Sequence, residues 1–175
     1  MGSDILAVLK ALHVPENSLG KVLAEKLKQV QPTKWYPIGM LLESFEALDA
    51  KLGTYALRSV GWQIFKLSHA ENIGKVASSA RDFVYGIDSM YHHANRGQNI
   101  GGWVVTRFDP GLAELEKTTP HHCVVEEGIL QEALRTIGVK AEIEQTQCLR
   151  RGDLVCHFRI TSQVVGERWS GKNSG

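Results

Sequence analysis

The stretch Cys123–Phe158, CVVEEGILQEALRTIGVKAEIEQTQCLRRGDLVCHF, decides the fold that this sequence predicts, and it contains all three cysteines of the chain. Apolar residues recur at helical spacing over Cys123–Ile137, which predicts a helix. Apolar and charged residues alternate over Val139–Glu144 and again over Leu154–Thr161, which predicts two strands. The turn Arg151–Asp153 lies between the strands, so we expect a helix followed by a hairpin.

A second hairpin is expected immediately upstream. Trp103–Phe108 is rich in residues that favour strands. In the turn Asp109–Gly111, the proline fixes φ at the second position and the glycine takes the left-handed conformation. Residues Leu112–Thr118 then alternate, with Ala113, Leu115 and Lys117 on one face. Together the two hairpins and the helix between them form a ββαββ unit.

The first half of the chain predicts about five helices. Their expected starts are Ser3, Ser18, Pro37, Thr54 and Asn72, each followed by an apolar stripe. Helices packed on an antiparallel sheet make an α+β domain. We therefore expect a single ligand-binding domain over residues 1–163, with helices in residues 1–31 available for dimerisation. Residues 164–175 are expected to form a flexible tail.

Composition excludes several classes of function. The chain has 175 residues, of which 43% are hydrophobic and 22% charged, and its net charge is +1. A chain so close to neutral is not expected to bind nucleic acid through a basic surface. Its longest apolar runs fall short of the roughly 20 residues that cross a bilayer. We expect a cytoplasmic protein without a membrane span.

Aromatic residues and one histidine are the candidate ligand-binding side chains. Small-molecule sites have mainly apolar and aromatic walls. Each aromatic candidate is also a candidate for ordinary core packing. For His92 or His93 the alternative to a metal or heme ligand is a solvated loop. The candidates are Trp35, Phe65, Phe83, Tyr85, His92 and Trp103.

The cysteines are candidates for metal binding, for redox chemistry or for simple burial. Cys123 falls in the first turn of the predicted helix, where exposed N–H groups stabilise a thiolate. Cys148 and Cys156 flank the hairpin turn. Odd-numbered residues face the core in Val139–Ile143, so Cys148 can share a face with Cys156 only if the strand shifts register. We therefore predict a β-bulge between Gln145 and Gln147.

The cysteine-containing segment resembles a known family. The residues Cys148–Phe158, together with Cys123, Glu127-Gly128 and the hairpin Arg107–Ala113, are similar to the signature of the vinyl-4-reductase (4VR) ligand-binding domain. The resemblance covers about residues 100–158 by motif, and the helical half by layout only. It implies the fold shared by H-NOX heme sensors and subunits of the TRAPP tethering complex, with a small-molecule pocket between helices and sheet.

The resemblance also implies a metal site. In phenol-responsive members of the family, three cysteines and a glutamate hold zinc, which carries over to Cys123, Cys148 and Cys156. Candidates for the fourth ligand of a structural zinc are the nearby Glu144, Gln145, His121, His122 and His157. Gln145 stands at the glutamate position, so Glu144 is our choice among them. The Tyr-x-Ser-x-Arg motif of H-NOX proteins is not found, so heme binding of that kind has no motif to support it.

Three functions follow as expectations. The first is a sensory domain that binds a small apolar or aromatic molecule, forms a homodimer and signals through a separate output protein. The second is a protein that binds a tetrapyrrole such as heme or a chlorophyll precursor, or an accessory reductase component. The third is a structural module of the tethering kind. No catalytic residues are assigned, because no nucleotide-binding or triad pattern can be placed.

Overall fold

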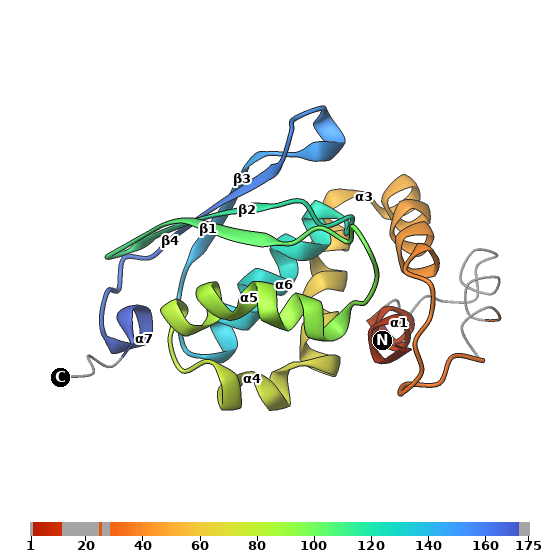
Figure 1. The fold of residues 1–175 in the computed structure, drawn as a ribbon, viewed down its shortest axis with the longest axis horizontal. Coiled ribbons are helices and arrows are strands. Elements are labelled where there is room, and N and C mark those ends of the chain that lie inside the picture. Colours follow the sequence, from red (N-terminus) through yellow and green to blue (C-terminus); the bar gives the residue numbers. More distant parts are fainter. Residues whose placement is uncertain (1, 12–24, 26–28, 172–175) are drawn as a thin grey trace.

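The computed structural model describes residues 2–11, 25 and 29–171. Helices come first and a ββαββ unit follows, so the predicted α+β class is confirmed (Figure 1). In chain order the elements are α1 (Gly2–Ala11), α3 (Gly39–Ser68), α4 (Ala70–Val76), α5 (Ala80–Ala94), β1 (Trp103–Asp109), β2 (Leu112–Lys117), α6 (Cys123–Thr136), β3 (Glu142–Gln147), the 3-10 turn η1 (Leu149–Arg151), β4 (Cys156–Thr161) and α7 (Glu167–Ser170).

The four strands form one antiparallel sheet in the order β1-β2-β4-β3. Both predicted hairpins are present, and β2 and β4 pair at the centre of the sheet. Figure 1 shows α5 and α6 on one face of the sheet, with α4 beyond them and α1 and α3 toward one end. Apolar side chains of β2 and β4 point to that helical layer, among them Leu115 and Phe158, which are fully buried.

The predicted bulge is present. The register between β3 and β4 shifts between Gln145 and Gln147. Gln145 pairs with Phe158 and Gln147 pairs with His157, so β3 has one extra residue there. One extra residue inverts the alternation of side chains between the two faces of the sheet for the residues that follow it. As a result Cys148 is buried on the same side as Cys156.

Two glycines let α3 and α6 cross in close contact. A Cβ atom at Gly61 would collide with the backbone oxygen of Val125, and one at Gly128 would collide with the backbone oxygen of Arg58. Arg58 also forms an ion pair with Glu127 across the same crossing, at 2.8 Å. The second half of α3 is therefore fixed against α6 by direct backbone contact.

The predicted break at Gly53 is present: its backbone is non-helical (φ 72°, ψ 174°) and divides α3 into the third and fourth predicted helices. The helical half differs from the prediction farther along the chain. The fifth predicted helix, over Asn72–Ile87, is two helices, because Ala77 is extended and Ser79 begins a new helix by accepting a hydrogen bond from the Asp82 N–H. Local side-chain capping outweighed the continuous apolar stripe.

Two segments expected to lack structure are ordered. Helix α5 continues through His92 and His93 to Ala94, where a polar loop was expected. The segment expected to be a flexible tail contains α7, whose Trp169 is 1% exposed. The Trp169 Nε1–H donates to the backbone carbonyl oxygen of Asp109 at 2.9 Å, and the Trp169 ring stacks on Phe108. A buried aromatic anchor of this kind outweighs the polar composition around it.

The predicted helix that starts at Ser18 lies largely outside the described residues, as does much of the expected dimerisation surface in residues 1–31. Among the described helices, none is both long enough and apolar enough to cross a membrane.

We predict that Gly61→Ala lowers the free energy of unfolding by about 1–3 kcal/mol, because the added methyl group forces α3 away from α6. Urea denaturation of the purified chain measures the change. Gly74→Ala is the matched control, since a Cβ at Gly74 meets nothing within 4 Å and alanine favours a helix by up to about 1 kcal/mol. Equal stability of the two variants would contradict the close crossing.

Candidate functional site

A cavity of about 860 Å³ lies between the helices and one end of the sheet. Its wall comes from α1, the segment before α3, α3 itself, α4, α5, the start of β1 and the start of α6. Most lining side chains are apolar or aromatic. Volumes of about 300–1,000 Å³ with such walls are typical of small-molecule sites.

Four of the six side chains proposed as ligand-binding residues line this cavity. Phe65, Phe83 and Trp103 are buried in its wall, and Trp35 is 37% exposed at its edge. The Arg96 guanidinium lies 4.0 Å from the centre of the Trp35 ring, a cation–π contact between two lining residues from separate segments. Binding by these four residues remains a prediction.

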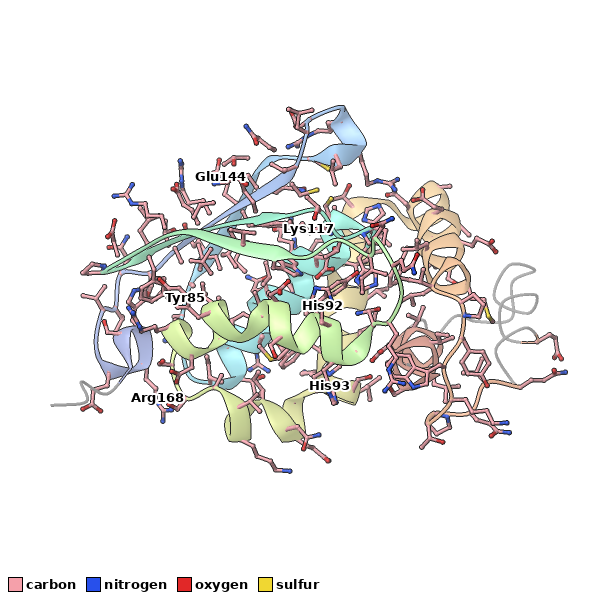
Figure 2. The ribbon with its side chains drawn as sticks, in the orientation of Figure 1. Tyr85, His92, His93, Lys117, Glu144 and Arg168 are labelled. Carbon is pink, nitrogen blue, oxygen red and sulfur yellow. The ribbon has the colours of Figure 1, made fainter. Side chains whose placement is uncertain are left out.

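The other two candidates do not line the cavity, which corrects the expectation. Tyr85 is 54% exposed and packs with Arg81 and Phe108 outside it. The His92 side chain is 46% exposed and lies 3.5 Å from the Asp88 carboxylate. His93, the next residue of α5, lines the cavity instead. Figure 2 labels both histidines on this helix. The sequence placed these residues in a loop, so their helical facing could not be read.

Partly buried His121 and buried Glu126 both line the cavity, as does Trp103. The His121 Nδ1 atom lies 2.9 Å from Glu126 Oε1. The Tyr91 ring meets the His121 ring edge-on, with centroids 5.6 Å apart, and the Tyr91 hydroxyl donates to the Ile100 oxygen at 2.6 Å. These contacts fix the imidazole at the cavity wall.

Lys117 completes this cluster behind the wall. Its ammonium is 0% exposed, donates to the His121 backbone oxygen at 2.7 Å and lies 3.7 Å from Glu126 Oε1. Burial by itself would raise the pKa of Glu126, but the charge of Lys117 and the hydrogen bond with His121 outweigh burial and lower that pKa. Glu126 therefore carries a buried negative charge that Lys117 balances.

The three cysteines meet on the other side of Lys117, which pairs with Cys156 across β2 and β4. Their sulfur atoms lie within 4.8 Å of one another, and all three side chains are buried. Cys123 Sγ is 2.9 Å from Cys156 Sγ and 3.3 Å from Cys148 Sγ. The prediction that the three thiols lie close together is confirmed. A zinc ion bound to them stays a prediction.

The thiols differ in acidity. A hydrogen bond from Cys123, assisted by the Leu149 N–H at 3.3 Å, lowers the pKa of Cys156 to about 7. That same hydrogen bond, together with burial, raises the pKa of Cys123. A thiolate at Cys156 is therefore accessible near neutral pH, and thiolates are the form that binds metals.

Glu144 is not the fourth member of this cluster, which corrects the expectation. Its side chain is 68% exposed, lies 3.8 Å from Arg159 and points to the face of the sheet away from the helices (Figure 2). The bulge begins after Gln145, so it turns Cys148 inward and leaves Glu144 outward. Gln145 is the half-buried residue of this pair, and its amide nitrogen is buried.

Sequence analysis missed the role of Lys117 and Glu126, although one signal was present. Lys117 is in phase with Ala113 and Leu115 on β2, so the alternation already placed a lysine on the buried face. A buried lysine requires a charged partner. Glu126 could not be named as that partner, because strand and helix meet only in the folded chain.

We predict that Lys117→Met lowers the free energy of unfolding at neutral pH by about 3–5 kcal/mol, because the buried Glu126 carboxylate loses the charge that balances it and keeps only its contact with His121. In the wild type, the lowered pKa of Glu126 contributes stability that is present above the ordinary carboxyl pKa of 4.5 and lost as the pH falls through the lower folded value. In the variant, burial raises this pKa. The difference between the two proteins therefore shrinks as the solution is acidified.

Urea denaturation at a series of pH values measures this difference. Lys140→Met, at an exposed position, is the control and should change stability by less than about 0.5 kcal/mol. A Lys117→Met penalty that is independent of pH would show that the lysine acts by packing alone.

Comparison with known proteins identifies the fold. No protein-family model and no curated protein matches the chain, whereas 40 chains of solved structures do. A crystal structure of an H-NOX protein from S. oneidensis in the Fe(II)NO state has a TM-score of 0.71 at 18% identity and covers 94% of this chain and 100% of its own.

Two further structures agree. An NMR structure of an H-NOX domain from Shewanella oneidensis in the Fe(II)CO state has a TM-score of 0.67 at 18% identity and covers 91% of this chain and 97% of its own. A structure from a study of heme distortion in the H-NOX family has a TM-score of 0.68 at 15% identity, with coverage of 98% and 100%. The chain therefore has the H-NOX fold.

Proposed function

We propose that this chain is a sensory domain that binds a small molecule in its cavity, and that the molecule is a heme-type tetrapyrrole. The observation that carries the proposal is the cavity of about 860 Å³, because it occurs in a chain with the H-NOX fold. The structural neighbours include H-NOX proteins in the Fe(II)NO and Fe(II)CO ligation states. This fold supports the tetrapyrrole function better than it supports an unspecified sensor or a tethering module.

The donor atoms of the cavity fit such a group. Imidazole is a common protein ligand of heme iron. His69, His93 and His121 all lie in the lining. The buried rings of Phe65, Phe83 and Trp103 offer apolar contact for a flat macrocycle. When bound, the iron would supply a site for a diatomic gas, and the apolar wall of this chain would keep water away from it.

Other parts of the function remain predictions from the sequence. These are the homodimer, the separate output protein and the cytoplasmic location. The 4VR relationship also stays a resemblance, because only the shared fold is supported by the comparisons.

We predict that hemin binds the purified chain with one saturable site and a shifted Soret absorbance band. Gly86→Phe should abolish this band, because Gly86 lines the cavity and its nearest obstacle is the flexible end of Met90, so a ring there fills the space that the ligand needs.

Gly74→Phe is the matched control, since Gly74 is an exposed helical glycine outside the lining. It should bind hemin as the wild type does. Absence of saturable binding by the wild type, or equal binding by Gly86→Phe, would contradict the proposal.

We also propose a structural zinc ion on Cys123, Cys148 and Cys156. The specific observation in favour is that their three sulfur atoms lie within 4.8 Å of one another, although they come from α6, the hairpin turn and β4. Zinc bonds thiolate sulfur at about 2.3 Å, a length that such a group can accommodate. Among the described residues no carboxylate or imidazole joins this group, so the fourth position would fall to water or to Gln145.

We predict about one zinc per chain in protein purified with zinc present, measured by elemental mass spectrometry. Cys148→Ser should lose the metal and melt at a lower temperature. Gln145→Glu should hold zinc more tightly against a chelator, because it adds a carboxylate ligand beside the thiols. Protein without zinc under every loading condition would refute the zinc site and leave three buried thiols.

A further inference from the structure

The charged groups in the wall of the cavity are paired, with one exception. The Asp4 carboxylate lies 3.3 Å from the His69 ring. The Glu126 carboxylate lies 3.7 Å from the Lys117 ammonium. Among the described lining residues, Arg96 alone carries a permanent positive charge. No carboxylate of the described residues lies within 4.0 Å of its guanidinium, so the wall offers a cation without a counter-charge.

Arg96 is held in place by Trp35. The centre of its guanidinium lies 4.0 Å from the centre of the Trp35 ring. Trp35 precedes α3 and Arg96 follows α5, so the contact joins two separate segments of the wall. Both side chains line the cavity and are exposed, so they lie where the cavity opens to solvent. We call this pair the cavity mouth.

The cavity mouth has the chemistry that recognises a carboxylate. Stacking on a ring occupies the flat face of a guanidinium and leaves the N–H groups at its edge free to donate. Two parallel N–H groups match the two oxygens of a carboxylate. The stacking also holds the side chain before a ligand arrives, which reduces the entropy lost on binding.

The rest of the wall indicates what the carboxylate is attached to. Phe65, Phe83 and Trp103 are buried in the wall and offer apolar contact. The carboxylates of the wall already have partners, so they leave no free negative charge for a cationic ligand. A molecule that fits has an apolar body inside the cavity and an acidic group at the mouth.

We propose that Arg96, positioned by Trp35, is an anion subsite that binds a carboxylate of the ligand, and that the ligand is therefore an amphipathic carboxylic acid. This inference rests on the proposed function, because it assigns a chemical class to the ligand of the same cavity. A tetrapyrrole with acidic side chains and a long-chain fatty acid share this chemistry, and paired probes distinguish the two sources.

Acids and their esters isolate the contribution of the carboxylate. Protoporphyrin and its dimethyl ester share one macrocycle, and palmitic acid and methyl palmitate share one aliphatic chain. Equilibrium dialysis measures the affinity of the purified chain for each probe. The wild type should bind the acid of at least one pair about tenfold more tightly than its ester. Added salt should weaken binding of the acid and leave binding of the ester unchanged.

Arg96→Gln removes the charge and keeps a polar side chain. It should weaken binding of the acid by about tenfold and leave the affinity for the ester unchanged. Arg96→Lys keeps the charge and loses the planar fork, so its affinity for the acid should lie between those of the wild type and Arg96→Gln.

Arg81→Gln is the matched control. The Arg81 guanidinium also lies over aromatic rings, 5.1 Å from the centre of Tyr85 and 5.5 Å from that of Phe108, but it does not line the cavity. Its variant should bind every probe as the wild type does. Equal losses of acid binding in Arg81→Gln and Arg96→Gln would show a general effect of surface charge and overturn the subsite.

The outcomes separate this inference from the proposed function. If the wild type binds acid and ester equally, or if Arg96→Gln keeps the wild-type affinity for the acid or weakens acid and ester alike, the inference is overturned while binding in the cavity stands. If the chain binds palmitic acid through Arg96 and binds neither porphyrin, the tetrapyrrole function fails and the anion subsite stands. If it binds none of the four probes, both fail.

Discussion

The buried ion pair between Lys117 and Glu126 is the interaction on which the site depends. It joins the end of β2 to the first turn of α6, and both side chains are buried. One side of the pair faces the cavity through His121, and the other side faces the thiols, since Lys117 lies opposite Cys156 in the sheet. Two charges without water are expensive unless they are paired and hydrogen-bonded, so the strand and the helix must meet in one register.

The cavity lies beside the close contact between α3 and α6. The second half of α3 lies directly on α6 at Gly61 and Gly128, and a hydrogen bond from Trp62 to Gln131 holds the same crossing. The kink at Gly53 turns the first half of α3 away. The apolar cluster around Phe45 is distinct from the core of the sheet, and residues of both clusters line the cavity.

Much of the sheet could be predicted from the sequence, because alternation and turn chemistry are local. Gly111 has φ 76°, as its turn required, and the parity of Cys148 against Ile143 predicted the bulge. The same parity argument could not tell whether Glu144 or Gln145 turns inward, because that depends on where the bulge begins. His92 and Tyr85 were misplaced for a related reason: the facing of a residue depends on the helix boundaries, and the cap at Ser79 set them.

The polar cluster of the cavity could not be predicted from the sequence, because its members come from separate elements. The alternation along β2 indicated only that Lys117 lies on the buried face.

The central claim is that the cavity binds a small molecule, and native mass spectrometry of the gently purified chain tests it most directly. The account predicts a complex of one chain with one ligand of the mass of heme, either as isolated or after incubation with hemin. A spectrum that shows the chain alone under both conditions would contradict it.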